Sequence, residues 1–132
     1  MYLMNHKRAI GALRATRRAS GLSRGRVAGE TRIAREQARV RRMDARRRHA
    51  ALAARLLTMP AAEAAAMLRY ARSVVDRWER DDLCSEHYIS RWRARLAGPA
   101  RRAAAALLEH NAWTDALLQN SPWSFALEPP AA

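Results

Sequence analysis

The sequence predicts an all-α protein, a small compact bundle of four to five short helices preceded by a long arginine-rich helix or arm. Two observations support this fold class. Beyond residue 50, apolar residues recur at spacings of three and four, which is the repeat of an amphipathic helix. Residues that start or stop helices divide the same stretch into segments of helical length. A chain of 132 residues is expected to form one domain.

The front of the chain is expected to consist of two parts. Residues 1–30 contain four glycines and one acid, which favours a flexible basic arm without stable structure. Residues 31–50 lack glycine and proline and predict an arginine-rich helix. We expect it to project into solvent, because arginines surround Ile33 and Val40 on almost every side. The helix should continue to Leu57. Apolar residues become more frequent toward its C-terminal end, which indicates that its last turns pack on a core.

Residues 51–127 are the predicted helical bundle. Helices are expected over residues 60–80, 86–97, 99–110 and 112–119. Their starts are marked by Pro60, Ser85, Pro99 and Asn111. Proline suits the first turn of a helix, and Ser and Asn side chains accept hydrogen bonds from otherwise unpaired backbone N–H groups. Gly98 is expected to end the helix before Pro99.

The core is expected to depend on aromatic residues, because the many alanines bury little area. In helix 60–80 the predicted buried stripe is Met67, Tyr70, Ala71, Val74 and Trp78, widened by Leu68 and Val75. The following helices are expected to add Ile89, Trp92, Leu96, Leu107, Leu108, Trp113 and Leu117. We expect the stretch from Tyr70 to Leu96 to form a helical hairpin whose two tryptophans meet in the core.

The C-terminal residues are expected to differ from the rest. Pro122 stops the last helix, and Trp123, Phe125 and Leu127 then alternate, which predicts an extended segment packed across the bundle. Trp123 and Phe125 are expected to be partly exposed. A lid over the core is the favoured interpretation, and a partner-binding edge is the alternative. Residues 128–132 are expected to be a frayed tail.

Charge is distributed unevenly. The chain carries a net charge of +13, with 15 Lys and Arg against 3 Asp and Glu in residues 1–48 and 10 against 9 in the remainder. Such asymmetry indicates a nucleic-acid or acidic partner. The bias toward Arg and Ala is also typical of a GC-rich, bacterial coding sequence. Met43 is then an alternative start, which would leave only a small positive charge.

The candidate nucleic-acid-binding residues fall into two sets. Those of the arginine-rich helix are Arg35, Arg39, Arg41, Arg42, Arg46, Arg47 and Arg48. Guanidinium groups suit bidentate contacts to phosphate, and such binding would be independent of sequence and sensitive to salt. The second set, Arg91 and Arg95, belongs to a helix–turn–helix interpretation of Tyr70–Leu96. The acidic turn at Asp81 and Asp82 disfavours that interpretation, and a structural hairpin is the simpler one.

Catalysis and metal binding are not expected. Cys84 and His87 lie three residues apart beside two aspartates, but zinc needs four ligands in a recognisable paired spacing. The surroundings of Cys84 contain no glycine-rich turn that would stabilise an oxyanion in a thiol enzyme. The sequence therefore predicts no cofactor and no enzyme. A single cysteine and the lack of long apolar segments favour the cytoplasm and argue against a membrane partner.

The sequence favours a small regulatory protein of the repressor, antitoxin or phage-regulator type. Its expected partner is DNA or RNA, bound through the arginine-rich arm, or alternatively an acidic protein. The rival hypothesis is a helical adaptor for protein–protein interaction, in which the basic arm is incidental. A homodimer remains open under both.

Overall fold

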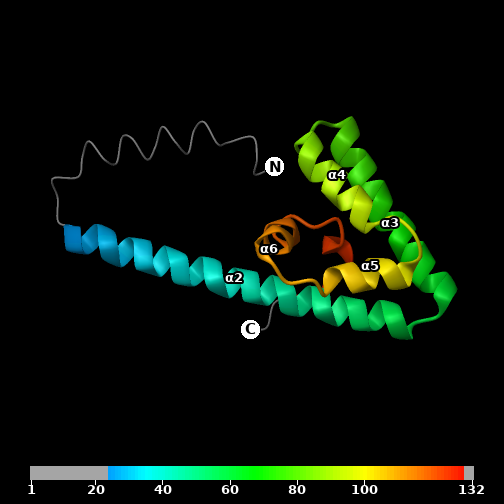
Figure 1. Cartoon of the computed structure of the whole chain (residues 1–132), viewed down its shortest axis with the longest axis horizontal. Coiled ribbons are helices and arrows are strands. Elements are labelled where there is room, and N and C mark those ends of the chain that lie inside the picture. The colour runs from blue at the N-terminus through cyan, green and yellow to red at the C-terminus, as the bar shows by residue number, and fades with distance from the viewer. Residues whose placement is uncertain (1–23, 130–132) are drawn as a thin grey trace. The chain divides into compact units, whose positions relative to one another are not determined.

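The computed structural model describes residues 24–129, and these form helices and connecting turns without a β-strand. The all-α prediction is therefore confirmed for the described part of the chain (Figure 1). The chain divides into two compact units, Met1–Val40 and Arg41–Ala132, which are described separately below. The helices are α2 (Arg24–Thr58), α3 (Ala61–Arg80), α4 (Glu86–Arg95), α5 (Ala100–Leu107), α6 (Ala112–Leu118) and the short 3₁₀ helix η2 (Ser124–Ala126).

In the first unit, the described residues 24–40 all belong to α2. This helix begins at Arg24, seven positions before the expected start, so the prediction of an unstructured arm is wrong for residues 24–30. Gly25 and Gly29 lie inside the helix, where each costs only about 1 kcal/mol relative to alanine. The Thr31 hydroxyl donates to the carbonyl of Val27 at 2.8 Å within the same helix. The remainder of the expected arm, residues 1–23, lies outside the described residues.

In the second unit, the last turns of α2 do contribute to the core. Leu52, Ala53 and Leu56 are buried, whereas Leu57 is 55% exposed. Buried contributions from the other segments are Ala64, Leu68, Ala71, Val75, Cys84, Tyr88, Ile89, Trp92, Leu96, Ala103, Ala104, Leu107, Leu117, Leu118 and Trp123. Many of these are alanines, which allow helix backbones to approach closely but add little apolar area of their own.

The hairpin of α3 and α4 forms as expected, and the two helices pack on each other (Figure 1). Ser85 is the N-cap of α4, and its side chain accepts a hydrogen bond from the Tyr88 amide. In the turn before it, Asp82 adopts a positive φ of 53°. Aspartate tolerates this left-handed conformation better than most residues, which lets the chain reverse here without a glycine.

The buried face of α3 is rotated relative to the predicted stripe. Leu68 and Val75, expected at its edge, lie at its centre with Ala71. Tyr70 is 52% exposed, so its assignment to the core is wrong. Trp78 is half-buried and does not join the fully buried Trp92 in the core. The error arises because Tyr70 and Val74 lie on the flank of a helix whose inner face consists of Ala64, Leu68, Ala71 and Val75.

The α4–α5 corner is stabilised from α3. Gly98 adopts a positive φ of 81°, as a glycine after a helix end often does. Arg72 of α3 donates to the carbonyl of Leu96 at 2.8 Å and to that of Gly98 at 2.9 Å. Leu108, expected in the core, is 44% exposed and lies just beyond the end of α5.

Helix α6 begins with the expected cap. Asn111 and Thr114 form a reciprocal capping box, in which each side chain accepts from the other residue's backbone amide. This cap satisfies two amides at the start of a helix of only seven residues. Trp113, which was expected in the core, is 48% exposed, whereas Leu117 is buried as expected, together with Leu118.

The C-terminal segment is not extended. Residues Ser124–Ala126 form η2, and the preceding Trp123 is 1% exposed. The expectation of a partly exposed Trp123 is therefore wrong, whereas Phe125 is 45% exposed as expected. The segment is held to α2, since Arg55 donates to the Ala126 carbonyl at 3.0 Å. Trp123 thus fills the core, and residues 130–132 of the expected tail lie outside the described part.

A buried histidine links this segment to α2. His49 is fully buried, and its Nδ1 lies 2.7 Å from the carbonyl of Ala45, to which it donates. Its Nε2 then accepts from the Ser121 hydroxyl at 2.8 Å, while Ser121 Oγ accepts from the amide of Trp123 at 3.0 Å. Burial lowers the pKa of His49, because the charged ring would lose its hydration.

Replacing the cap of α6 should destabilise the protein. Asn111→Ala removes the acceptor for the Thr114 amide, and the free energy of unfolding should fall by about 1 kcal/mol. Urea unfolding followed by far-UV circular dichroism measures this change. Asn111→Asp keeps a side-chain acceptor and should stay close to the parent protein. Equal stability of Asn111→Ala and the parent would contradict the role of the cap.

Because His49 is buried, the free energy of unfolding should fall as the pH drops from neutral to mildly acid values. The unfolded chain binds a proton at His49 near the ordinary pKa of 6.5, whereas the folded chain does so only at lower pH. The stability that neutral His49 provides is therefore complete above pH 6.5 and is lost progressively below it. His49→Gln should show a shallower decline of unfolding free energy between neutral and mildly acid pH. Parallel pH profiles for the two proteins would refute this assignment.

Candidate nucleic-acid interface

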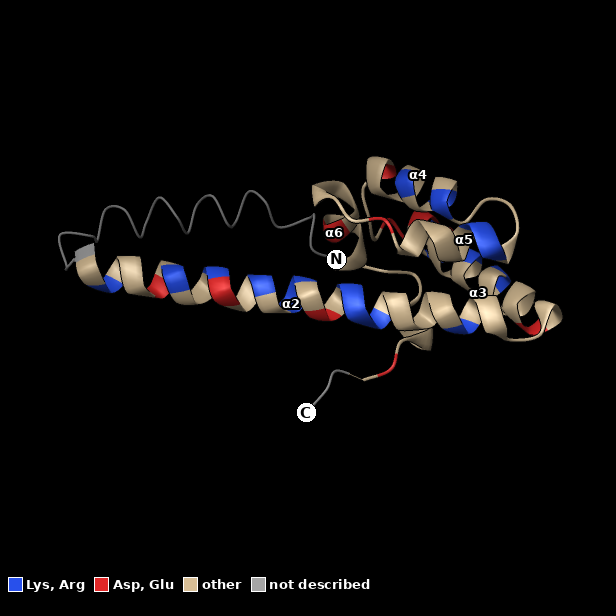
Figure 2. Ribbon diagram, turned by 60° about the horizontal axis from the view of Figure 1, so that its bottom comes forward, with Lys and Arg blue, Asp and Glu red and all other residues tan. Residues whose placement is uncertain are grey.

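The arginines of α2 divide into those with an intramolecular hydrogen bond or ion pair and those without one. Arg41, Arg42 and Arg47 of the second unit are exposed and make no hydrogen bond or ion pair with any residue that the structure describes. In the first unit, the same is true of Arg35. Figure 2 shows that basic residues recur along the whole of α2. These four candidate guanidinium groups can meet an external anion without giving up a present hydrogen bond, and the exposed Arg32 of the first unit, which was not a candidate, can do the same.

Two further candidates have local partners. Arg39 forms an exposed ion pair with Glu36, and its Nε lies 3.1 Å from the Glu36 carboxylate. Arg48 lies 3.7 Å from Asp44 and donates to the carbonyl of Glu128 at 2.6 Å. An exposed pair between neighbours on one helix contributes little to stability and is readily exchanged for a phosphate. Arg39 is therefore still suited to anion contact, whereas Arg48 also holds the C-terminal segment.

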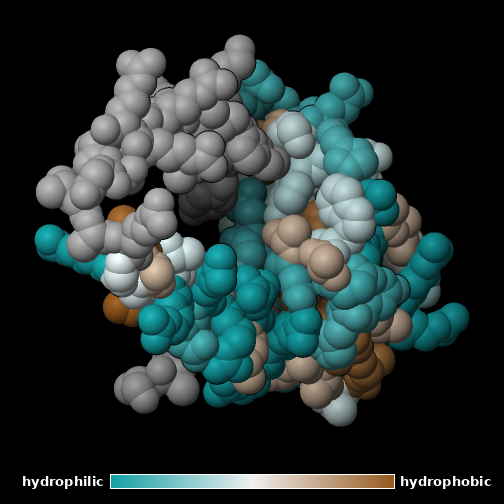
Figure 3. All heavy atoms as spheres, turned by 60° about the vertical axis from the view of Figure 1, so that its left-hand side comes forward, coloured by the Kyte–Doolittle hydropathy of each residue, from teal (hydrophilic) through white to brown (hydrophobic). Residues whose placement is uncertain are grey.

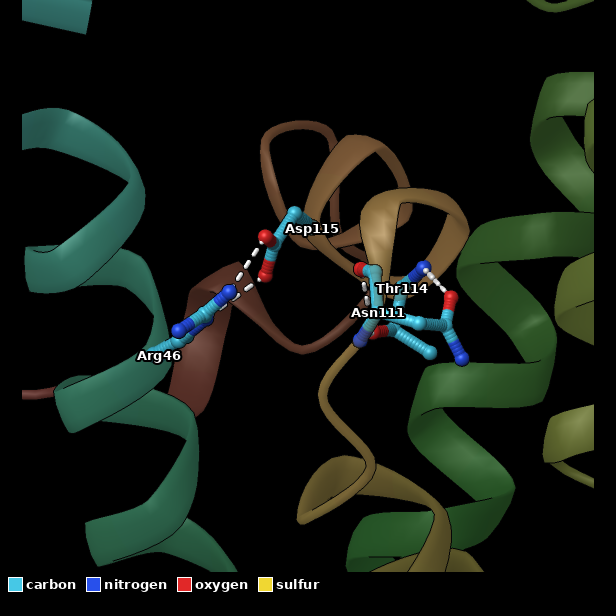
Figure 4. A network of polar contacts seen from close by, with 4 residues as sticks. All are labelled: Arg46, Asn111, Thr114 and Asp115. Atoms are coloured by element: carbon cyan, nitrogen blue, oxygen red, sulfur yellow. Dashed lines mark hydrogen bonds and ion pairs between the residues drawn. The ribbon is translucent and has the colours of Figure 1, made fainter. Parts of the chain in front are cut away.

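Arg46 makes an intramolecular contact that stabilises the fold. Its Nε donates to Asp115 Oδ1 at 2.7 Å and its Nη2 to Oδ2 at 2.5 Å, in a bidentate pair that joins α2 to α6 (Figure 4). Asp115 is 8% exposed and lies in the first turn of α6, next to the capping box. The hydrogen bonds from Arg46 lower the pKa of Asp115. Bidentate geometry makes this a strong, directional contact, so Arg46 is a poor candidate for binding nucleic acid.

The arginines of α4 also have partners within the bundle. Arg91 places its guanidinium 4.6 Å from the ring centre of Trp113. Arg93 bridges Asp76 and Glu79 of α3, which raises the pKa of its guanidinium further. Arg95 donates to the Ala106 carbonyl at 3.1 Å and to Glu109 at 3.0 Å. These contacts favour the structural hairpin over a helix that reads DNA bases.

Cys84 lies in the turn between α3 and α4. Cys84 is buried, and its sulfur accepts a hydrogen bond from the Asn120 side chain at 3.4 Å. The ring of His87 packs against Trp113, with ring centres 5.3 Å apart. A hollow of about 400 Å³ beside Cys84 is lined by Glu79, Asp82, Glu86, Ile89, Ser90 and Arg93. Within residues 24–129, no group of three or more His, Cys, Asp or Glu is placed to hold a metal ion.

The two aromatic candidates for partner binding have different environments. Trp123 is buried and cannot contact a partner in this conformation. Phe125 is half exposed and lies 4.4 Å from the ring of Tyr70 of α3, which is also half exposed. The two rings form a small aromatic surface patch, and only Phe125 was identified from the sequence. The face drawn in Figure 3 is mostly hydrophilic, and its hydrophobic side chains form separate patches.

Two features of this surface were missed by sequence reasoning. Asp115 lies 69 residues from Arg46, and no local pattern indicates that they pair. Arg102 was not singled out, although it lines a hollow with Arg91 and Arg95. The charge of Asp115 within a mostly apolar stretch, AWTDALL, offered the one signal.

No protein-family model matches the chain, and the searches of curated proteins and of solved structures likewise return no match. Across the described helices, none is both long enough and apolar enough to span a membrane.

Loss of the Arg46–Asp115 pair should destabilise the protein in a pH-dependent way. Asp115→Asn should lower the urea midpoint at neutral pH, because the charge-assisted bonds disappear. The carboxylate's contribution is complete above its ordinary pKa of 3.8 and is lost as pH falls through its lower folded-state pKa. The difference between parent and variant should therefore persist at mildly acid pH and shrink below pH 3.8.

An exposed ion pair supplies the control for this experiment. Glu79→Gln removes one partner of Arg93, whose other partner Asp76 remains, and should have a smaller effect. If Asp115→Asn is no more destabilising than Glu79→Gln at neutral pH, the pair does not hold α6 to α2.

Proposed function

We propose that this protein is a small, non-enzymatic regulator that binds DNA or RNA through the exposed arginines of α2, independently of base sequence. The observation that carries the proposal is the set of three exposed arginines, Arg41, Arg42 and Arg47, that make no hydrogen bond or ion pair with the described residues. A repressor, antitoxin or phage regulator is the class of protein that this arrangement suits best.

The helical spacing of these arginines supports contact with phosphates on several sides. With about 100° of rotation per residue, Arg41 and Arg42 diverge by about 100° and Arg47 lies about 140° beyond Arg42. Arg46, which lies between Arg42 and Arg47 around the helix, is paired with Asp115, so α6 covers that face of α2. The three exposed guanidinium groups can reach phosphates from the faces that remain open. In the first unit, Arg35 offers a contact of the same kind, and Arg39 offers one when a phosphate replaces its partner Glu36.

The test is the salt dependence of binding to a short duplex. The variant Arg41→Gln, Arg42→Gln, Arg47→Gln should bind more weakly at low salt, because it can neutralise up to three fewer phosphates. The slope of log K against log salt concentration should become shallower by about 0.9 for each phosphate that is no longer neutralised. Fluorescence anisotropy of a labelled duplex at several salt concentrations gives both quantities.

The matched control removes the same charge elsewhere. Arg69→Gln, Arg77→Gln, Arg101→Gln replaces three exposed arginines of α3 and α5 that also make no hydrogen bond or ion pair in the described part of the chain. This control should keep most of the affinity and of the salt slope. If both triple variants weaken binding equally, only the net charge matters and the assignment to α2 is wrong.

A second candidate function is that of a helical adaptor for protein–protein interaction. The exposed pair of Tyr70 and Phe125, with ring centres 4.4 Å apart, favours it. Aromatic residues are enriched at the centres of protein interfaces. Under this alternative, neither triple arginine variant should alter partner binding, and Tyr70→Ala with Phe125→Ala should abolish it.

A further inference from the structure

A hollow on the second unit carries arginines from two helices. It has a volume of about 290 Å³ and lies where α4 packs on α5. Its lining consists of Arg91, Ala94, Arg95, Arg102, Ala105, Ala106 and Glu109. The three alanines leave room between the longer side chains. The volume lies just below the range of about 300–1,000 Å³ for ligand sites, which suits a small charged group.

The charge of this hollow favours an anion. Three guanidinium groups line it, and the single carboxylate, Glu109, is already paired with Arg95 at 3.0 Å. Arg102 is exposed, and its guanidinium makes no ion pair or hydrogen bond with another described residue. Arg95 is fixed by its additional bond to the Ala106 carbonyl, so its position does not depend on a ligand. Fixed guanidinium groups are well suited to hold a phosphate.

An exposed tryptophan lies beside this hollow. Arg91 belongs to the lining and also places its guanidinium 4.6 Å from the ring centre of Trp113. Trp113 is 48% exposed, although a side chain of this size is normally buried in so small a bundle. Proteins that bind single-stranded nucleic acid combine cationic grooves with aromatic side chains on which unpaired bases stack. A duplex offers no unpaired base for such stacking.

We propose that the hollow between α4 and α5 binds a phosphate of a single-stranded nucleic acid while Trp113 stacks on a neighbouring base. Arg102 and Arg95 contact the phosphate, and Arg91 lies between the phosphate and the base. This site rests on the proposed function, because its partner is also a nucleic acid. It uses none of the α2 arginines, so an experiment can refute either assignment and leave the other standing.

A short oligothymidylate is the probe, followed by tryptophan fluorescence and by anisotropy of a labelled copy. Binding to the full chain should quench part of the fluorescence, because Trp92 and Trp123 are buried, Trp78 of α3 is half-buried, and Trp113 is the most exposed of the four tryptophans. Trp113→Ala should weaken binding about tenfold, within the range for loss of one stacked base. Trp113→Phe should retain most of the affinity and lose the ligand-dependent quenching. Quenching that persists unchanged in Trp113→Phe would overturn the stacking assignment.

The phosphate contact has a matched control in the neighbouring residue. Arg102→Gln should weaken oligothymidylate binding several-fold, whereas Arg101→Gln should not, since the exposed Arg101 does not line the hollow. If the two variants weaken oligothymidylate binding equally, the loss of net charge alone explains the effect and the proposed site is wrong. An abasic phosphodiester of the same length should bind more weakly and without quenching. Equally tight binding of a polyglutamate peptide would also overturn the proposal.

The same variants separate this site from the α2 interface. Arg41→Gln, Arg42→Gln, Arg47→Gln should leave the quenching of Trp113 by oligothymidylate intact while duplex binding weakens. If the triple variant leaves duplex binding unchanged and Arg102→Gln still weakens oligothymidylate binding, the proposed function of α2 fails and the hollow stands. If Arg102→Gln and Trp113→Ala change nothing, the hollow fails and the α2 assignment is unaffected.

Discussion

The fold of the second unit depends on the burial of Trp92 and Trp123 within a core in which several of the other buried residues are alanines. Each is 1% exposed, and few other large side chains are as completely enclosed. Alanines such as Ala53 and Ala104 let the helices approach closely, but they cannot supply the apolar area that offsets the entropy of ordering the chain. The two indoles supply much of that area. Trp123 reaches the core only because the segment after α6 turns back onto α2, where His49 and Arg55 hold it.

Polar contacts also explain why the high positive charge is not all available to a partner. Arg46 and Arg48 each bind the C-terminal half of the unit, and Arg72, Arg93 and Arg95 stabilise the hairpin and its corner. Much of the arginine content is thus structural, since one guanidinium can satisfy several acceptors at once. A count of charges overstates the binding surface. The guanidinium groups that remain for an external anion are fewer than the net charge suggests, and they lie at a few defined positions.

The sequence predicted the features that depend on neighbouring residues. The helix count and the caps at Ser85 and Asn111 follow from local hydrogen bonding and are confirmed. The core was predicted less well, because the inner faces of α3 and α6 are set by partners distant in sequence. Tyr70 and Trp113 were placed in the core from helical spacing and aromatic size, and both are about half exposed. The hollow at Arg102 could not be foreseen, since it exists only once α4 and α5 meet.

The long reach of the contacts made by α2 has a kinetic consequence. His49 meets Ser121, and Arg48 meets Glu128, across 72 and 80 positions of the chain. On the ribosome, the early helices leave the exit tunnel well before these partners are synthesised. The apolar side chains of Leu52 and Leu56 therefore stay exposed until the C-terminal segment has been synthesised. Completion of the core is a late folding event for so small a helical protein. The nascent chain, rather than the finished molecule, is the state most exposed to aggregation and to proteases.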